Sequence, residues 1–223
     1  MITALAYLFN GIVVGIFAYK CYSIGYKNGL KNSFTNYLFW TTLLVAIVAF
    51  KMSIMVAAAF YNSNETLLFW SDITTRPLYY ISSIFAVQIP LYKYYPNDKR
   101  RFIFSYIAGA LGIALVIYQV FNRNIPTFGA NGIIDWHPDL ILTTGMGCLM
   151  VAPWAATSFI FIREYLTSKS KNLKSILLGF GFMLIVVGVF GQEYTNIVSL
   201  YITFNIISLL GYLFALAGLY YED

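Results

Sequence analysis

Apolar residues along this chain gather in seven long stretches, and short polar, basic or turn-forming segments separate them. The stretches are Ile2 to Ile24, Asn36 to Phe60, Arg76 to Tyr94, Phe102 to Phe121, Asp139 to Ile162, Ser175 to Gly191 and Ile197 to Tyr220. Each approaches or exceeds the roughly 20 residues that a helix needs to cross the hydrocarbon core of a bilayer. The pattern predicts an all-α fold, a polytopic membrane helical bundle of seven transmembrane helices.

The composition supports lipid as the solvent of this bundle. Of the 223 residues, 60% are hydrophobic and only 10% are charged, which leaves too few polar side chains to cover a water-soluble domain of this size. Seven crossings use nearly the whole length, so we expect residues 1–223 to form a single seven-helix transmembrane domain. The lipid bilayer is therefore the first expected partner.

Basic residues fall almost entirely in alternate connections between the stretches. Eleven lie in one set of connections, and the other set holds only Arg76 and Arg123. Because cytoplasmic loops collect lysine and arginine, this partition predicts an N-terminus outside and a C-terminus in the cytoplasm, in a multi-pass protein of the plasma (cytoplasmic) membrane. The formal net charge of +5 then reports orientation, and we expect no nucleic-acid partner.

One lysine belongs to neither set of connections. Lys51 lies about nine residues from the outer end of the second stretch, roughly 13 Å deep at the helical rise per residue. An ionisable group at this depth normally faces the bundle interior and has a partner, so it indicates a functional site. The alternative is that its stem extends outward, where carbonyl groups, water or Glu193 satisfy the amine; Asp72 is the other nearby carboxylate.

Other polar side chains reach about the same level in the outer half of the predicted bundle. The candidate ligand-binding residues are Lys51, Asn10, Asn205, Ser82, Ser83 and Thr144, with Thr143 and Cys148 close by. Together they predict a polar layer able to hold a small-molecule or lipid ligand. Pro90 and Pro153 interrupt two of the stretches and act either as hinges or as static kinks.

The segment from Asp135 to Asp139 holds the only histidine of the chain, His137. In an extended conformation its two acids and the histidine share one face, but a closed metal site needs a fourth ligand. Asp139 fits equally well as the residue that begins the fifth helix. We therefore expect no metal, and Asn64-Glu65-Thr66 is a glycosylation signal only in a secretory-pathway cell.

Catalytic constellations are missing from the sequence. One histidine in an outer connection does not provide bis-histidine haem ligation, the chain has no Gly-rich phosphate loop, and no predicted span contains paired acids. We expect neither an enzyme nor a resident cofactor.

Three known families offer partial resemblances. The run from Asp72 to Leu78 resembles the aspartate, paired threonines and proline in the third helix of microbial rhodopsins, which have seven spans and an outside N-terminus. In that family a lysine of the seventh helix binds retinal, and the stretch Ile197 to Tyr220 has none. Size and topology also resemble the seven-helix sensor regions that precede bacterial histidine kinases, and the small sugar transporters with two three-helix repeats. No diagnostic motif is matched, so no family is assigned.

These observations favour a receptor-like or sensor-like seven-helix membrane module. It would bind a small or lipidic ligand in the outer half of the bundle and act through a membrane or cytoplasmic protein partner, because no output domain follows the last stretch. One alternative is a small secondary transporter with a mid-membrane polar site. Another is a non-catalytic subunit of a larger membrane complex, whose small-residue spacings, such as Gly11 with Gly15, Ala108 with Gly112 and Ala110 with Ala114, would seat neighbouring helices.

Overall fold

The computed structural model describes residues 1–27, 34–96, 98–129, 132–136, 139–168, 172–193, 195 and 197–221. Its helices are α1 (Ile2–Lys27), α2 (Phe34–Tyr61), α3 (Glu65–Tyr94), α4 (Arg101–Phe121), α5 (Leu140–Met146), the π-helical segment η1 (Gly147–Val151), α6 (Ala152–Thr167), α7 (Leu173–Glu193) and α8 (Val198–Tyr220). Strands β1 (Thr127–Phe128) and β2 (Ile134–Asp135) form one antiparallel hairpin. Because α5, η1 and α6 follow one another without a break, the described residues form seven helices and this hairpin, and the predicted all-α class is confirmed.

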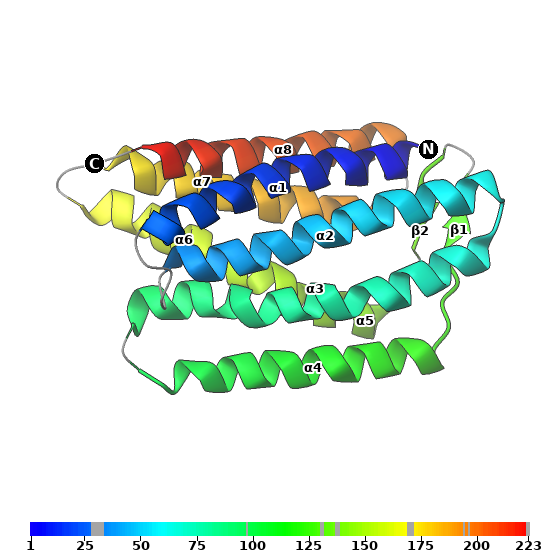
Figure 1. Cartoon of the computed structure of the whole chain (residues 1–223), viewed down its shortest axis with the longest axis horizontal. Helices are drawn as coiled ribbons and strands as arrows, with labels where there is room; N and C mark the ends of the chain where they lie inside the picture. The colour runs from blue at the N-terminus through cyan, green and yellow to red at the C-terminus, as the bar shows by residue number, and fades with distance from the viewer. Residues whose placement is uncertain are drawn as a thin grey trace.

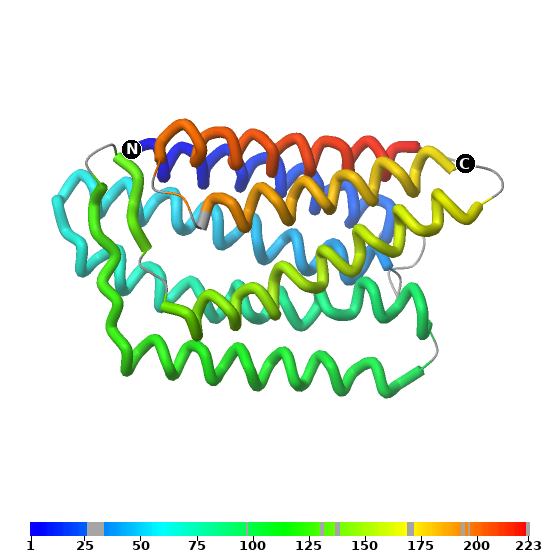
Figure 2. The backbone as a smooth tube through the Cα atoms, turned by 180° about the vertical axis from the view of Figure 1, so that it is seen from behind, coloured from blue at the N-terminus to red at the C-terminus, as the bar shows by residue number. Residues whose placement is uncertain are grey.

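The helices lie side by side along the long axis of the molecule and alternate in direction (Figure 1). One end, which we name the hairpin end, carries Met1, the turn between α2 and α3, and the β1–β2 hairpin. The opposite end, which we name the basic end, carries the turn between α3 and α4. The C-terminal end of α6 and the N-terminal end of α7 also lie there. Seen from behind, α4 lies at the edge of the bundle beside α3 (Figure 2).

Six of the helical segments are long and apolar enough to cross a membrane. They are Ile2–Gly25, Phe34–Tyr61, Arg101–Phe121, Leu140–Thr167, Leu173–Gln192 and Val198–Tyr220. Large apolar side chains such as Ile54, Ile113 and Phe159 are exposed on their outer faces, where they meet lipid without cost. The chain is therefore a multi-pass membrane protein that associates with the lipid bilayer, and α3 is the long helix that hydropathy does not select.

Helix α3 begins eleven residues before the predicted start at Arg76. Its N-cap is Asn64, whose side chain accepts a hydrogen bond from the Leu67 backbone N–H at 3.0 Å. Such a cap satisfies one of the first orphan N–H groups of a helix and so fixes where the helix begins. Asp72 and Arg76, expected in or at the edge of an outer loop, consequently lie within α3, and Pro77 is also inside it.

Helices α7 and α8 approach each other through glycine. A Cβ atom placed on Gly181 would lie 2.6 Å from the backbone nitrogen of Ala215, and one on Gly211 would lie 2.7 Å from the backbone nitrogen of Ile185. In lipid, where apolar side chains gain nothing by leaving the solvent, such backbone contact is a main source of helix association. Of the predicted small-residue spacings, the one at Gly112 does give close packing, because a Cβ there would lie 2.7 Å from Tyr80 Cβ. Gly15 has no such contact: apart from the backbone of α1, no described heavy atom lies within 4 Å of its Cβ position.

Candidate functional site

The hairpin covers one end of the bundle and is attached to it by hydrogen bonds. The Phe128 backbone N–H donates to Glu65 Oε1 at 3.0 Å, and the Ile134 N–H donates to Thr3 Oγ1 at 3.2 Å. Ile133 and Ile134 are buried against the helices below. These contacts tie β1 and β2 to the first turns of α3 and α1, and they position the chain that follows β2 over the gap between the helices.

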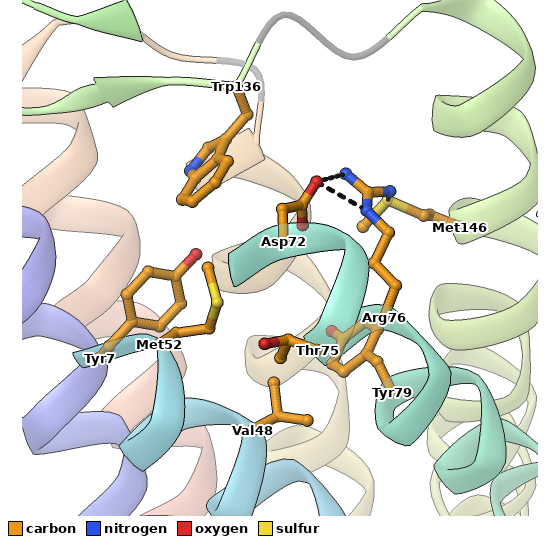
Figure 3. A pocket seen from close by; sticks show the side chains of 9 residues that line it. All are labelled: Tyr7, Val48, Met52, Asp72, Thr75, Arg76, Tyr79, Trp136 and Met146. Carbon is orange, nitrogen blue, oxygen red and sulfur yellow. Dashed lines mark hydrogen bonds and ion pairs between the residues drawn. The ribbon is translucent and has the colours of Figure 1, made fainter. Parts of the chain in front are cut away.

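A pocket lies beneath this hairpin, and side chains from five parts of the fold line it (Figure 3). Its volume is about 90 Å³. The lining residues are Tyr7 from α1, Val48 and Met52 from α2, Asp72, Thr75, Arg76 and Tyr79 from α3, Trp136 from the chain after β2, and Met146 at the end of α5. A single water occupies roughly 10–15 Å³ on this kind of measure, so the pocket holds several waters or a small organic molecule.

An ion pair forms the polar wall of the pocket. Arg76 Nη2 lies 2.7 Å from Asp72 Oδ2, and Arg76 Nε donates to the same oxygen at 2.9 Å. Gln119 of α4 also donates to this oxygen, so all three contacts are made to Asp72 Oδ2. The pair is nearly dry, since the two side chains are only 9% and 14% exposed. Buried charges of this kind persist only when they are paired and hydrogen-bonded.

The remaining polar atoms around the pair leave room for a further partner. Arg76 Nη1 contacts Met146 Sδ at 3.0 Å, a weak acceptor for a guanidinium. Gln119 Oε1 is buried and accepts no hydrogen bond from any residue that the structure describes. Gln119 donates to Asp72 but does not itself line the pocket.

The π-helical segment η1 follows Met146 directly. The Ala152 backbone N–H donates to Gly147 O, five residues back, and Pro153 comes next in the chain. Proline has no N–H and cannot make the usual helical hydrogen bond to the residue four positions back. The wider π-helical turn before Pro153 accommodates this missing bond. Single π-helical turns of this kind occur often at functional sites. Pro153, predicted as a hinge or a kink, thus lies beside a local irregularity that begins at the pocket.

Two of the predicted site residues meet each other. Asn10 Nδ2 donates to Asn205 Oδ1 at 2.9 Å and to Ala6 O at 3.0 Å, and Asn205 Nδ2 donates to Tyr201 O at 2.8 Å. Both amides are therefore engaged by protein groups, and the pair joins α1 to α8. This arrangement is that of an interhelical clamp.

Lys51 has a partner, but it is a hydroxyl and not a carboxylate. Lys51 Nζ donates to Thr74 Oγ1 at 2.9 Å, at an exposed position on the seam between α2 and α3. Its neighbour Met52 is one of two α2 residues that line the pocket. Lys51 therefore lies at the rim of the bundle, which is closer to the predicted alternative of a lysine that extends outward than to a lysine inside the bundle. The side chain of Glu193, named in that alternative, lies outside the described part of the chain.

The other predicted residues lie apart from the pocket. Ser82 and Ser83 are buried in α3 and donate to the carbonyl groups of Tyr79 and Tyr80, both at 2.6 Å. Thr144 is exposed on α5. None of the six predicted residues is among the nine that line the pocket, so ligand binding at those six positions stays a prediction.

Asp139 begins α5, as one interpretation of the segment from Asp135 to Asp139 predicted. Asp139 Oδ1 accepts from the Leu142 N–H at 2.8 Å and so caps α5, and its Oδ2 accepts from the Tyr118 hydroxyl at 2.9 Å. His137 lies outside the described residues. Within the described part of the chain, no cluster of three or more histidine, cysteine or acidic residues has metal-site geometry.

The fold and the pocket define a multi-pass helical membrane protein with a small pocket under the hairpin, lined mainly by apolar atoms and by the Asp72–Arg76 pair. Comparisons with protein-family models, curated proteins and solved structures found no match for this chain. A helical bundle alone does not determine function, and the pocket is the feature of this fold that indicates one.

Proposed function

We propose that this protein is a receptor-like seven-helix membrane module that binds a small ligand in the pocket at the hairpin end. The observation that carries the proposal is the pocket itself, with the Asp72–Arg76 pair on one wall and Tyr7, Met52 and Trp136 facing it (Figure 3). A concave site with an apolar lining and a few convergent polar groups is the usual form of a small-molecule site.

The proposed topology has seven crossings, with the N-terminus outside. Helix α3 has 30 residues and a length of roughly 45 Å, and it lies antiparallel between α2 and α4. If α2 and α4 cross the membrane in the same direction, α3 must cross back between them. The basic end carries Lys93, Lys99 and Arg163, which favours its placement in the cytoplasm of a cell whose plasma membrane holds the protein.

The chemistry of the pocket favours an uncharged or zwitterionic ligand. Asp72 and Arg76 cancel each other's charge, so a ligand with a net charge would lose its hydration without a compensating partner. Tyr7, Met52 and Trp136 provide an apolar and polarisable wall for a compact aromatic or aliphatic body. A donor group on the ligand would suit Asp72, whose contacts with Arg76 and Gln119 all fall on the Oδ2 atom.

Helix α3 offers the route by which ligand binding would reach the cytoplasmic side. It carries the pocket residues Asp72 and Arg76 near one end, and at the other end Lys93 pairs with Glu164 of α6 at 3.0 Å. Because α3 connects the two sites, a shift at the pocket would change the α3–α6 contact at the basic end if Pro77 and Pro90 are static kinks and not hinges. A partner protein that reads this contact would complete the signal.

Gentle purification followed by mass spectrometry of retained small molecules tests the proposal. We expect wild-type protein to retain one small molecule, and Trp136→Ala to lose it because the substitution removes the wall formed by the hairpin. Trp70→Ala is the matched control, since Trp70 is an exposed tryptophan of α3 that does not line the pocket. Equal retention by both variants would overturn the assignment of the site.

Uptake into proteoliposomes separates a receptor from the alternatives. Once the retained molecule is known, a receptor should bind it without raising its concentration inside the vesicles. Uptake that exceeds passive leakage and disappears in Trp136→Ala would make the protein a transporter that uses the same pocket. Aggregation of the lone chain in detergent, relieved by a co-purifying protein, would favour the subunit of a larger complex.

A further inference from the structure

The guanidinium of Arg101 is buried at the basic end, in the first turn of α4. Arg101 is only 6% exposed, and its guanidinium carbon lies 4.8 Å from the ring centre of Tyr92 and 5.8 Å from that of Tyr37. Nη2 lies 3.5 Å from the Tyr37 hydroxyl, while Nε and Nη1 are buried without a hydrogen-bond partner among the described residues. Buried guanidinium donors are normally engaged, so these two indicate a missing acceptor.

The described carboxylates at this end are committed to other cations. Asp98 accepts from the Arg100 backbone N–H at 2.8 Å and pairs with Arg100 Nε at 3.3 Å. The backbone hydrogen bond holds the pKa of Asp98 below its usual range, so this carboxylate stays ionised beside Arg100. Glu164 pairs with Lys93 at 3.0 Å. Arg101 therefore adds an uncompensated positive charge to the basic end.

An apolar groove runs along the outer side of α3 and α4, and it begins beside two of the aromatic rings that lie against the Arg101 guanidinium. It consists of two cavities of about 530 Å³ and 340 Å³ that share Ile84, Gly109 and Ile113. Tyr37 and Phe102, which both contact the Arg101 guanidinium, line its end nearest the basic end. From Phe102 to Ile117 the groove follows sixteen residues of α4, a rise of roughly 22 Å, which exceeds the ~15 Å depth of one leaflet.

We propose that this groove binds an anionic phospholipid of the cytoplasmic leaflet, with its phosphate on Arg101 and one acyl chain between α3 and α4. A guanidinium fork matches phosphate oxygens, and the two unused donors of Arg101 suit such an acceptor. Basic pockets between helices on the cytoplasmic side are typical sites for anionic headgroups. The adjoining aromatic rings and apolar groove account for the acyl chain, which a soluble phosphate compound does not have.

Native mass spectrometry of the full-length protein in neutral detergent tests the wild type first. The probes are phosphatidylglycerol and phosphatidylcholine with identical acyl chains, and free glycerol phosphate. We expect phosphatidylglycerol to be retained about fivefold more than phosphatidylcholine, as one added cationic contact allows, and glycerol phosphate not to displace it. Equal retention of the two lipids would overturn the proposal, and displacement by glycerol phosphate would reassign the site to a soluble anion.

Paired variants separate the headgroup contact from the groove. Arg101→Gln should abolish the preference for phosphatidylglycerol, whereas Arg100→Gln, one residue away with a side chain 85% exposed, should keep it. An unchanged preference in Arg101→Gln would mean that the aromatic rings alone stabilise the guanidinium, and the proposal would fail.

A second pair of variants tests whether the groove binds the acyl chain. This pair keeps the proposal testable if Arg101→Gln does not fold. Gly109→Leu fills the groove, because a Cβ there meets only the Ile84 side chain, at 3.4 Å. It should lower retention of both lipids, while Ala114→Leu, on an exposed position of α4 outside the groove, should not. Unaltered retention in Gly109→Leu would exclude the groove as the acyl-chain site.

Discussion

Two pairs of helices in this protein associate in opposite ways. Helices α7 and α8 meet backbone to backbone: a Cβ on Gly181, Gly188 or Gly211 would come within 2.7 Å of a backbone atom of the other helix. Helices α3 and α4 meet through large and polar side chains, among them Gln88, which donates to Ser105 at 2.7 Å, and a groove remains between them. The first pair has the packing of a scaffold, and the second has space for a ligand.

The difference places structural and functional demands on different helices. Close glycine contacts have no tolerance for added volume, so the α7–α8 unit holds one arrangement. Around α3, buried polar atoms such as Gln119 Oε1, and Nε and Nη1 of Arg101, have no hydrogen-bond partner among the described residues. Groups of this kind cost stability when they are left alone, and they favour ligands that complete them. Four substitutions test this contrast.

Asp72→Asn should have the largest effect, because it leaves the Arg76 guanidinium charged and buried without its counter-ion. Removing one partner of a buried pair typically lowers the free energy of unfolding by about 3 kcal/mol. The same change should abolish retention of the small molecule. Thermal melting in detergent and mass spectrometry measure the two effects.

Asp98→Asn is the matched control for this pair. Asp98 also pairs with an arginine, but Arg100 is 85% exposed and water solvates it readily. Exposed pairs contribute less than about 1 kcal/mol, so we expect nearly wild-type melting. If the two aspartate variants melt alike, the Asp72–Arg76 pair is not the buried polar element on which the contrast depends.

Gly181→Ala should come next, through the scaffold and not through the pocket. The new methyl group would lie 2.6 Å from the backbone nitrogen of Ala215, so the helices must separate, at a cost of about 2 kcal/mol. Gly15→Ala adds the same group where, apart from the backbone of α1 itself, no heavy atom of the described residues lies within 4 Å, and it should be neutral or slightly stabilising. Both variants should keep the ligand when folded. Equal melting would show that α7 and α8 adjust as readily as α3 and α4.

Much of this architecture follows from the hydrophobic pattern of the sequence. Six predicted stretches coincide with described helices that are apolar enough to span a membrane, with ends that differ by a few residues. Periodic apolar segments of about 20 residues leave few alternatives to a helix in lipid. Helix α3 is the exception, because Asp72 and Arg76 lower its hydropathy and Pro77 suggests a helix start there. The Asn64 cap and the i, i+4 spacing of Asp72 and Arg76 were the signals for its true beginning.

The candidate site was less accessible to sequence reasoning. The predicted polar layer rests on depth alone, and depth does not show which way a side chain points around its helix. Lys51 and Met52 are adjacent in sequence, yet Met52 lines the pocket and Lys51 lies on the outer seam. Trp136 reaches the pocket because the hairpin folds over the bundle, a tertiary arrangement that no local pattern in the chain encodes.

Asn10→Ala tests whether the asparagine pair is a clamp of the scaffold. The change leaves Asn205 Oδ1 without its donor at the α1–α8 contact and should cost about 1 kcal/mol. In a double-mutant cycle, adding Asn205→Ala should cost little more, since the partner is already unpaired. Retention of the small molecule should be unchanged. Loss of the ligand in Asn10→Ala would return both asparagines to the binding site.

Lys51→Met should have the smallest effect. It removes one exposed hydrogen bond to Thr74 and keeps the apolar stem, so melting should change by less than ~0.5 kcal/mol. Thr74→Val removes the other partner and should behave in the same way. Because Lys51 lies on the rim and not on the pocket wall, neither variant should release the small molecule. If Lys51→Met alone released it, the lysine would contact the ligand directly, and the binding site would extend from the pocket across the α2–α3 seam.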